Sequence, residues 1–423
     1  MIACVGFNRG VLSEDDIESV IQEAVGQLSI DGKKVLVVIP DGTRTMPLPL
    51  FFRLLVKHLE PRSDALTFMV ALGTHPVLSE RALLGLVGIS PEQKARKYAN
   101  VVLTSHAWDD PSALVTLGTI EAEVIAEISG GLLNEPMPVR VNRAVLEHDH
   151  VLICGPVFPH EVVGYSGGDK YFFPGVSGPE LIDMTHWLGA LITSYHTCGI
   201  KHTPVREAIR RAAILIPTPY HAFCAVVTPE ARVAGLYFGE SHTAWSAAAD
   251  LSAEWHIKWL ERPYQTVFSA VSTHYHDLWT GAKGMYKVEP VVADGGEVII
   301  YAPHITEVSY THGALLDEVG YHVRDYFLQN WGSYKGYPRA VLAHSTHLRG
   351  LGTYENGFEE PRIRVMLATG IPRERCEKIN LGYLDPHSLN PAEWQSREEE
   401  GILFVPQAGE TLYRVGRKAQ IDG

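Results

Sequence analysis

The chain has 423 residues, of which 46% are hydrophobic and 20% charged, and its formal net charge at pH 7 is −13. These proportions are ordinary for a globular protein, and the acidic balance argues against a broad surface for nucleic acid or anionic membranes. No stretch approaches the run of about 20 apolar residues that a membrane-spanning helix needs, so no membrane partner is predicted. A small anionic substrate is still compatible, because a pocket can be basic within an acidic protein.

The length predicts two domains, because a single core rarely grows beyond about 250–300 residues. The five cysteines are odd in number and scattered, which predicts reduced thiols in a cytoplasmic protein rather than a disulfide framework. Twenty histidines are a high count and the one compositional hint of metal or proton chemistry. The sequence carries no signal for an oligomeric state.

The first half of the chain alternates between predicted helices and strands. Apolar residues at helical spacing behind an acidic first turn predict a helix over 14–30, and further helices are expected over 48–59 and from about Ser79. Short apolar runs predict strands, and this alternation is typical of an α/β fold with a mainly parallel sheet. The predicted strands are 34–39, 65–71, 100–104, 151–154, 213–216 and 223–227.

The pattern changes near residue 250. A helix is predicted over 244–260 and a linker over 261–264, and a second α/β unit follows. Its strands are expected near 266–270, 297–301, 340–344 and 364–368, and the segments 402–405 and 411–415 are expected to return to the first domain. The predicted domains are therefore 1–255 with a returning segment of about 402–423, and 262–400, with the active site in the cleft between them.

Polar residues follow several of the predicted parallel strands. Asp41, Arg44, His75 and His106 each come after a strand, and so does the segment His160–Gly178. Ligands of parallel α/β sheets bind beyond the carboxyl ends of the strands. This shared placement predicts a site at one edge of the first sheet.

The segment His160–Gly178 combines a histidine, hydroxyl groups, five glycines and Lys170. It is not a phosphate-binding P-loop, which needs Gly-Lys-Ser/Thr. Lys170 is then either an anion contact or an amine placed for covalent chemistry. The flanking His160 and His186 could serve as a metal ligand and as an acid or base, although a single histidine is more often structural.

Two further patterns leave alternatives open. Asp41-Gly-Thr-Arg44 is either a carboxylate-binding turn or a turn that caps neighbouring helices. The spacing of His196, Cys198 and His202 matches no strong zinc pattern. The sequence assigns no role to His106, His196, His202, Trp331, His344 and His347.

Taken together, these residues resemble the lactate racemase family, whose members use the nickel-pincer nucleotide. The resemblance covers both predicted domains, and its most specific part is Gly164-Tyr-Ser-Gly-Gly-x-Lys170 with Pro174-Gly-Val-x-Gly178. The order and spacing of the supporting motifs also fit. Those motifs are Asp41-Gly-Thr-Arg44, Leu72-Gly-Thr-His75, Ser105-His106 and Ala282-Lys283-Gly284.

The resemblance implies a 2-hydroxyacid racemase that depends on nickel and on cofactor-synthesis enzymes as partners. A pyridinium mononucleotide with two thio-acid arms is tethered to a lysine matching Lys170, and its nickel is bound by a histidine matching His186. Acid and base on the two faces of the substrate carbon match His75 and His160. The substrate carboxylate contacts match Arg44 and Lys283. The remaining cofactor contacts implied by the resemblance are Asp41, Tyr165, Ser166, Gly167 and Gly168.

One departure from the family concerns the substrate wall. Lactate-specific members carry Tyr-Gln a few residues before the substrate-binding lysine, where this chain has Trp279-Thr280 before Lys283. The change argues against lactate itself, and an aldonic acid or a larger 2-hydroxy acid is the alternative. The many polar aromatic and histidine residues of the second predicted domain favour the sugar acid. Two alternatives stay open: a divalent-metal hydrolase or lyase using the same histidines, and a non-catalytic protein that binds the cofactor or nickel.

Overall fold

The computed structural model describes residues 1–7, 9–73 and 75–416 and divides into two compact units. Both units are mixed α/β with mainly parallel sheets, as predicted. None of the helices in the described part of the chain combines the length and apolar character that a bilayer crossing requires. The first unit comprises Met1–Phe158, Tyr165–Thr185 and Pro204–Trp255, and the second comprises Pro159–Gly164, His186–Thr203 and the described chain from His256 onward.

A seven-stranded sheet with the order β1-β11-β10-β7-β2-β3-β4 forms the centre of the first unit. The strands from β10 to β4 are parallel to their neighbours, whereas β11 is antiparallel to both β10 and β1. Their bounds are β1 (Ala3–Gly6), β2 (Lys33–Pro40), β3 (Ser63–Ala71), β4 (Val101–Ser105), β7 (His150–Pro156), β10 (Tyr220–Val227) and β11 (Val233–Gly239).

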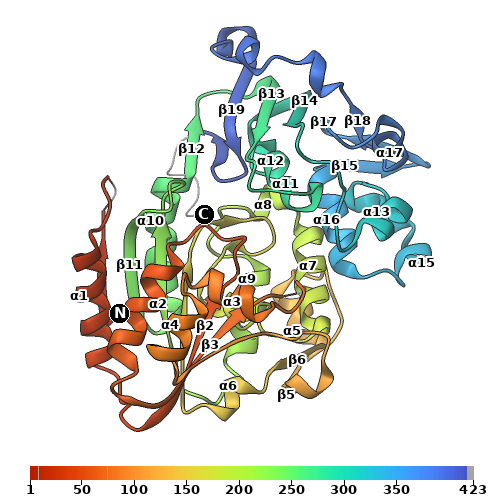
Figure 1. Cartoon of the computed structure of the whole chain (residues 1–423). Helices are drawn as coiled ribbons and strands as arrows, with labels where there is room; N and C mark the ends of the chain where they lie inside the picture. The colour runs from red at the N-terminus through yellow and green to blue at the C-terminus, as the bar shows by residue number, and fades with distance from the viewer. Residues whose placement is uncertain (8, 74, 417–423) are drawn as a thin grey trace. The chain divides into compact units, whose positions relative to one another are not determined.

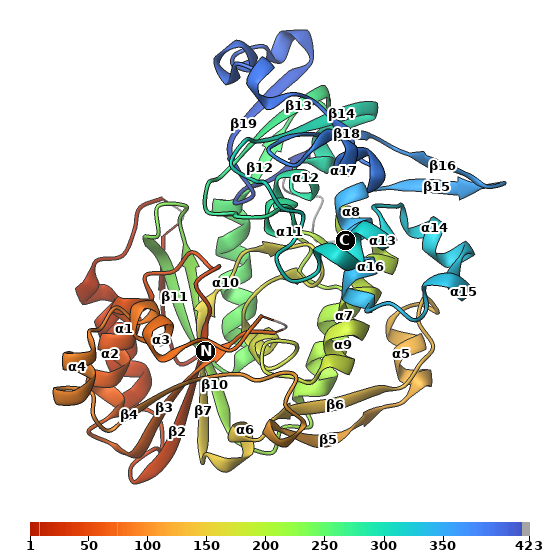
Figure 2. The same ribbon diagram turned by 45° about the vertical axis from the view of Figure 1, so that its right-hand side comes forward.

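Both faces of this sheet are covered. Helices α1 (Glu14–Gly26) and α2 (Leu48–Leu59) pack on one face, as Figures 1 and 2 show. Their buried residues share a core with alternate residues of the strands. On β7, a Cβ added to Gly155 would lie only 1.9 Å from the hydroxyl of Tyr171. A glycine is therefore required at this position, and it lets the segment that carries Lys170 pack directly against the strand.

Additional elements complete the first unit. Strands β5 and β6 pair as an antiparallel hairpin outside the main sheet. The elements are α3 (Glu80–Leu86), α4 (Pro91–Arg96), β5 (Leu114–Ile120), α5 (Ala122–Ile128), β6 (Met137–Asn142), α6 (Ala144–Glu147), α9 (Pro204–Ala213) and α10 (Ser241–His256), with α7 (Pro179–Ile192) beginning in this unit.

The second unit is built on a five-stranded parallel sheet with the order β18-β17-β14-β13-β19. Strands β12 and β20 form a separate parallel pair, and the antiparallel hairpin β15–β16 projects from this unit in Figure 2. The bounds are β12 (Ile257–Leu260), β13 (Tyr264–Val271), β14 (Val292–Ala302), β15 (Gly352–Glu355), β16 (Phe358–Pro361), β17 (Arg364–Thr369), β18 (Gly382–Tyr383), β19 (Ile402–Ala408) and β20 (Leu412–Val415).

The helices of the second unit are mostly short. The longest of them, α16, is buried along most of its length, from Val341 to Leu348. Their bounds are α8 (Ser194–Thr197), α11 (Leu278–Gly281), α12 (Lys283–Tyr286), α13 (Gly313–Val319), α14 (Arg324–Gln329), α15 (Trp331–Tyr334), α16 (Arg339–Arg349) and α17 (Arg373–Lys378).

Two predicted strands are wrong. Residues 340–344 lie in α16, because a short apolar run does not distinguish a buried helix from a buried strand. At 213–216 the chain instead leaves α9, and Ile214 is 65% exposed. The predicted helix over 244–260 is wrong at its end, since α10 stops at His256 and β12 follows.

The predicted return of the C-terminal segment to the first domain is also wrong for its described part. Strand β19 pairs in parallel with β13, and β20 pairs in parallel with β12, so both belong to the second unit. Residues 417–423 of the predicted segment lie outside the described residues. The apolar pattern predicted the strands themselves, but strand partners depend on long-range packing that periodicity does not encode.

Candidate functional site

In the first unit, Asp41 and His75 form a close hydrogen-bonded pair. They follow the neighbouring parallel strands β2 and β3, and His75 Nδ1 lies 2.7 Å from Asp41 Oδ2. The other carboxylate oxygen of Asp41 accepts the Thr43 hydroxyl at 2.6 Å and the Thr43 N–H at 3.1 Å. Thr74, in the predicted Leu72–His75 motif, lies outside the described residues. The sequence predicted both strand ends, but not the pairing of these two side chains.

This pair fixes the protonation pattern of His75. Burial would raise the pKa of Asp41, but the hydrogen bond from His75 and the nearby charge of Arg44 outweigh it and hold the pKa well below its usual range. An ionised Asp41 accepts the Nδ1 proton of the imidazole, so the lone pair of neutral His75 is at Nε2. The His75 side chain is 44% exposed, and its Nε2 is thus suited to accept a proton.

Arg44 and Tyr171 lie near this pair. The Arg44 guanidinium is 5.5 Å from the ring centroid of Phe158, which follows β7. Burial raises the pKa of Tyr171 far above its ordinary value, against a lowering influence of Arg44, so its hydroxyl stays protonated. Arg44 is half-buried and therefore suited to bind a small carboxylate, as the resemblance implies.

Lys170 emerges from an otherwise buried loop. Every residue from Val162 to Asp169 is buried, whereas Lys170 is half-buried, in the 3₁₀ turn η2 (Gly168–Tyr171). The loop is joined to the turn that carries His75 by a hydrogen bond from the Gly73 N–H to the Gly175 carbonyl, at 3.0 Å. The structure therefore brings together Asp41, Arg44, His75 and the Lys170 loop in one unit.

Backbone conformation and close packing within the protein require the glycines of this loop. Gly167 and Gly168 have φ of 84° and 58°, and an added Cβ would lie 2.5 Å from the Val157 side chain and 2.9 Å from Trp245, respectively. Ser166 is also fully engaged, since its hydroxyl donates to the Pro156 carbonyl at 3.0 Å and accepts the Phe158 N–H at 3.1 Å. These contacts account for the residues structurally, and their implied contacts to a cofactor stay predictions.

His106, which the sequence left unassigned, has a structural role. It is fully buried, with Nε2 2.9 Å from the Ser177 carbonyl and Nδ1 3.1 Å from the Asn142 amide. Burial lowers its pKa, so it is the neutral ring that makes both hydrogen bonds. His106 thus fastens the end of the Lys170 segment to β6.

Replacing His106 with alanine is expected to destabilise the protein by about 2–3 kcal/mol, because two buried hydrogen-bonding groups lose their partner. Urea unfolding measures this change. His196, which is exposed, provides the control, and its alanine variant is expected to change stability by less than about 0.5 kcal/mol. Equal stability of both variants would contradict the structural role of His106.

In the second unit, His160 has the opposite protonation pattern to His75. It is 5% exposed on the short strand β8 (Pro159–His160), and its Nδ1 accepts the Val162 N–H at 3.1 Å. The proton of the neutral ring is therefore assigned to Nε2. Glu161 Oε2 lies 3.3 Å from the same Nδ1, so a doubly protonated His160 would find a carboxylate partner there. The geometry thus supports both the neutral and the charged ring.

His186, the predicted nickel ligand, is half-buried on α7 and has two histidines of α16 in its surroundings. Burial, together with neighbouring imidazoles including His186, lowers the pKa of His344 far below its usual range. Burial also lowers the pKa of His347 to about 4, although Glu161 opposes this effect. Two histidines that are neutral at pH 7, His344 and His347, therefore lie near His186 in this unit. Among the described residues, no group of three or more His, Cys, Asp or Glu is arranged to hold a metal ion.

Trp279, the predicted substrate wall, is half-buried and stacks on neighbouring rings. Its ring centroid lies 4.0 Å from His344 at an interplanar angle of 24°, and 4.7 Å from His312. The Tyr321 hydroxyl lies 3.3 Å from His344 Nε2. The indole thus packs against the buried His344, which in turn contacts the buried Tyr321.

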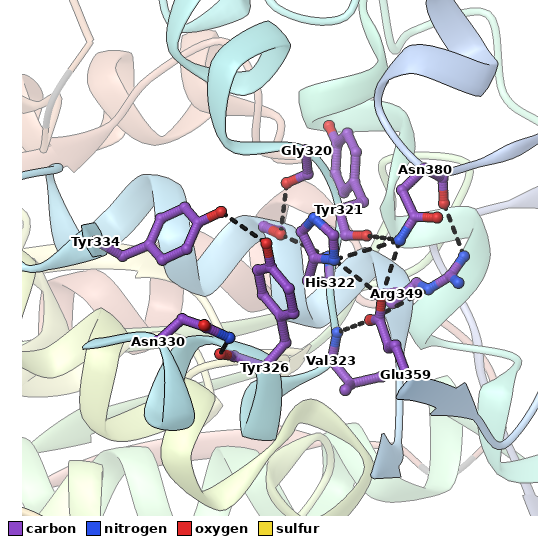
Figure 3. A network of polar contacts seen from close by, with 11 residues as sticks. Gly320, Tyr321, His322, Val323, Tyr326, Asn330, Tyr334, Arg349, Glu359 and Asn380 are labelled. Atoms are coloured by element: carbon purple, nitrogen blue, oxygen red, sulfur yellow. Dashed lines mark hydrogen bonds and ion pairs between the residues drawn. The ribbon is translucent and has the colours of Figure 1, made fainter. Parts of the chain in front are cut away.

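A polar network in turn holds the backbone at Tyr321, as Figure 3 shows. The Asn380 amide donates to the Tyr321 carbonyl at 3.0 Å and to Glu359 Oε2 at 2.9 Å. Glu359 also accepts the Val323 N–H at 2.6 Å and pairs with His322 Nδ1 at 2.9 Å. The hairpin strand β16, which carries Glu359, therefore helps to hold the segment Tyr321–Val323 in place.

Trp279 and Thr280 lie on α11, and Lys283, another predicted substrate residue of this unit, lies on α12. Thr280 donates its hydroxyl to Asp277 Oδ1 at 2.7 Å as part of the cap of α11, so its side chain also has a structural role. Lys283, at the start of α12, places its amine 4.6 Å from the ring centroid of Tyr275. Trp279 and Lys283 are four residues apart, the separation that places side chains on one side of a helical stretch.

The remaining residues without a predicted role are exposed or half-buried. His196 and His202 are exposed. Trp331 stacks on the buried Trp187 with centroids 5.2 Å apart, and the Arg339 guanidinium lies over its ring. These contacts are typical of packing, and they indicate no chemical role.

Comparison with known sequences identifies the family. Residues 14–199 match the model of the lactate racemase N-terminal domain. The chain is 23% identical over 318 residues to a lactate racemase of Thermoanaerobacterium thermosaccharolyticum, covering 70% of this chain and 67% of that protein. It is equally 23% identical over 313 residues to a lactate racemase of Lactiplantibacillus plantarum, with the same coverage.

Solved structures resemble the chain over nearly its whole length. A crystal structure of a Thermotoga maritima protein matches with a TM-score of 0.87 at 30% identity and covers 97% of this chain and 100% of its own. The lactate racemase apoprotein of T. thermosaccharolyticum matches with a TM-score of 0.71 at 16% identity, covering 96% and 94%. The fold, the domain match and the sequence relatives agree, and the chain belongs to the lactate racemase-like family.

Proposed function

We propose that this protein is a racemase or 2-epimerase that inverts C2 of a 2-hydroxy acid, using a nickel-pincer nucleotide tethered to Lys170. The family supports a racemase role. The single observation that carries the proposal is the 2.7 Å contact between Asp41 and His75, next to the buried loop that ends at the half-buried Lys170. A carboxylate that fixes the tautomer of a histidine is how proteins prepare an imidazole to accept a proton.

The two predicted acid–base histidines are prepared differently. His75, whose Nδ1–H donates to Asp41, would accept the hydroxyl proton of one enantiomer at Nε2, and the carboxylate would stabilise the resulting imidazolium. His160 would return a proton to the substrate oxygen from Nε2, with Glu161 stabilising its charged form. For the other enantiomer the two roles exchange, which requires neutral His160 to carry its proton on Nδ1, where Glu161 Oε2 lies 3.3 Å away and would accept it, so that Nε2 is open to the substrate proton.

The residues present fit the proposed cofactor. When bound, the nickel-pincer nucleotide would supply reversible hydride chemistry at C2 of the substrate. Lys170 would hold it covalently, and His186 would supply a neutral imidazole to nickel, the form that binds metals. Arg44 and Lys283 would bind the substrate carboxylate, Arg44 through two parallel hydrogen bonds.

The proposed substrate is a 2-hydroxy acid other than lactate, such as a sugar acid, because Trp279 and Thr280 stand where lactate-specific members of the family carry Tyr-Gln. Trp279→Tyr combined with Thr280→Gln is expected to raise kcat/KM for lactate relative to an aldonate by about tenfold or more, the scale on which pocket shape discriminates small side chains. Steady-state kinetics on a panel of both substrate types measures this ratio. An unchanged ratio, with equal cofactor loading, would exclude these two positions as the specificity wall.

The test of the function is stereoinversion by protein produced together with the cofactor-synthesis enzymes. Enantiopure 2-hydroxy acids and aldonates are incubated with this protein, and the C2 configuration is followed by chiral chromatography. Inversion of at least one substrate is expected. Hydrolytic turnover with a bound divalent metal and no inversion would instead favour the hydrolase or lyase alternative, and nucleotide binding without any turnover would favour a carrier. Cytoplasmic location stays a prediction.

A further inference from the structure

Two buried side chains hold the loop that precedes Lys170. On α9, the Arg206 guanidinium donates to the carbonyl of Gly167 at 3.1 Å and to the carbonyl of Tyr165. On α10, the Trp245 indole N–H donates to the Ser166 carbonyl at 2.9 Å. Three consecutive carbonyls of the loop therefore accept hydrogen bonds from only two side chains.

These two side chains also pack against each other and against the loop. The Arg206 guanidinium carbon lies 4.2 Å from the Trp245 ring centroid, and both residues are at least 95% buried. Gly168 is in contact with Trp245, since an added Cβ there would lie 2.9 Å from the tryptophan Cβ. Arginine, tryptophan and loop thus form one packed assembly, named here the loop clamp.

The loop clamp requires an arginine at position 206 rather than a lysine. Burial lowers the pKa of Arg206 to about 10, opposed by Asp169, so the guanidinium is charged at neutral pH. A buried charge is costly unless its donors are used, and a planar guanidinium can reach two carbonyls while stacking on an indole. A lysine ammonium has neither the fork nor the flat face.

We propose that Arg206 and Trp245 are positioning residues that fix loop 165–168 and thereby present Lys170 for attachment of the nucleotide. A preorganised amine needs less ordering at the moment of reaction, and Lys170 is the half-buried residue at the end of the clamped loop. The inference rests on the proposed function, in which Lys170 is the attachment site. The sequence gives no signal for it, because Arg206 and Trp245 are about 40 and 80 residues from the carbonyls they bind.

The test uses Arg206→Lys, which keeps the charge, and Trp245→Phe, which keeps an aromatic ring but removes the N–H. The control is Arg210→Ala, one turn further along α9, where the arginine is ion-paired with Glu207 at the surface. All proteins are compared at a temperature at which each is folded by near-ultraviolet circular dichroism. Amide hydrogen exchange is measured on the protein without cofactor, and intact mass on protein produced with the cofactor-synthesis enzymes.

Both clamp variants are expected to exchange the amides of residues 165–170 about tenfold faster than the wild type and the control. Their fraction of Lys170 adduct at a fixed time is expected to be at least about fivefold lower. Wild-type exchange in this loop would overturn the clamp, and faster exchange with an unchanged adduct fraction would overturn its role in presenting Lys170.

Two further outcomes can be distinguished from a failure of the loop clamp. If Arg206→Lys does not fold, Trp245→Phe alone decides, because phenylalanine fills most of the same space. If the wild type never gains an adduct in competent cells, the proposed function fails, while the exchange data still decide whether the two side chains hold the loop.

Discussion

Lys170→Ala is expected to abolish racemase activity and covalent nucleotide binding together. Without the amine no covalent tether forms, and the loss of turnover is expected to be at least about 10⁴-fold. The measurement pairs intact mass with stereoinversion of the best substrate. The wild type should carry the extra mass of one nucleotide adduct, and peptide mapping should place it on Lys170.

Lys34→Ala provides the matched control, because Lys34 is an exposed lysine of the same unit. It should retain both adduct and activity. Racemisation by Lys170→Ala at a rate near that of the wild type would show that the tether is not needed. An adduct on another lysine would show that Lys170 is not the attachment site.

Asp41→Asn is expected to lower kcat by about 10²–10⁴-fold while the adduct on Lys170 is kept. An asparagine amide can donate to His75 Nδ1 and so favours the tautomer with its proton at Nε2, which cannot accept a substrate proton. Thr43→Val is the milder control, since it removes only one hydrogen bond to Asp41. Steady-state kinetics and intact mass are measured in parallel, and full activity of Asp41→Asn would exclude the proposed role of the pair.

Asp41→Asn is also expected to change how the stability of the native state depends on pH. The pKa of Asp41 is held below its unfolded value near 3.9, so its ionisation stabilises the native state above that pH. This contribution declines as the pH falls through the folded pKa. Asp41→Asn should therefore lose less stability than the wild type between about pH 4 and pH 2, as urea unfolding at stepped pH will measure.

The sequence predicted the parallel core of both units where the chain alternates cleanly between apolar strands and amphipathic helices. The strand at 34–39 is confirmed because its five apolar residues from Val35 to Ile39 are buried on both faces. The strand at 340–344 is wrong because a buried helix presents the same run of apolar letters. The partners of β19 and β20 depend on contacts with strands far away in the chain, which periodicity does not record.

For the candidate site, the sequence predicted which residues lie at the strand ends but not what each side chain contacts. The carboxylate of Asp41 is hydrogen-bonded to His75, 34 residues away in the sequence, and its expected contact with a cofactor stays a prediction. The role of Ser166 in bracing its own loop and that of His344 behind Trp279 likewise depend on the folded geometry. The resemblance supplied a chemical hypothesis, and the structure added the partners that prepare the side chains for it.

The most direct test of the account is the fate of the hydrogen at C2. Loaded enzyme is incubated in ordinary water with its best substrate carrying deuterium at C2, and the inverted product is analysed by mass spectrometry. Since the hydrogen is proposed to leave and return as hydride while His75 and His160 handle only the hydroxyl proton, the product is expected to retain deuterium. Replacement of that deuterium by solvent hydrogen at the rate of inversion would show removal of C2 as a proton and would contradict the account.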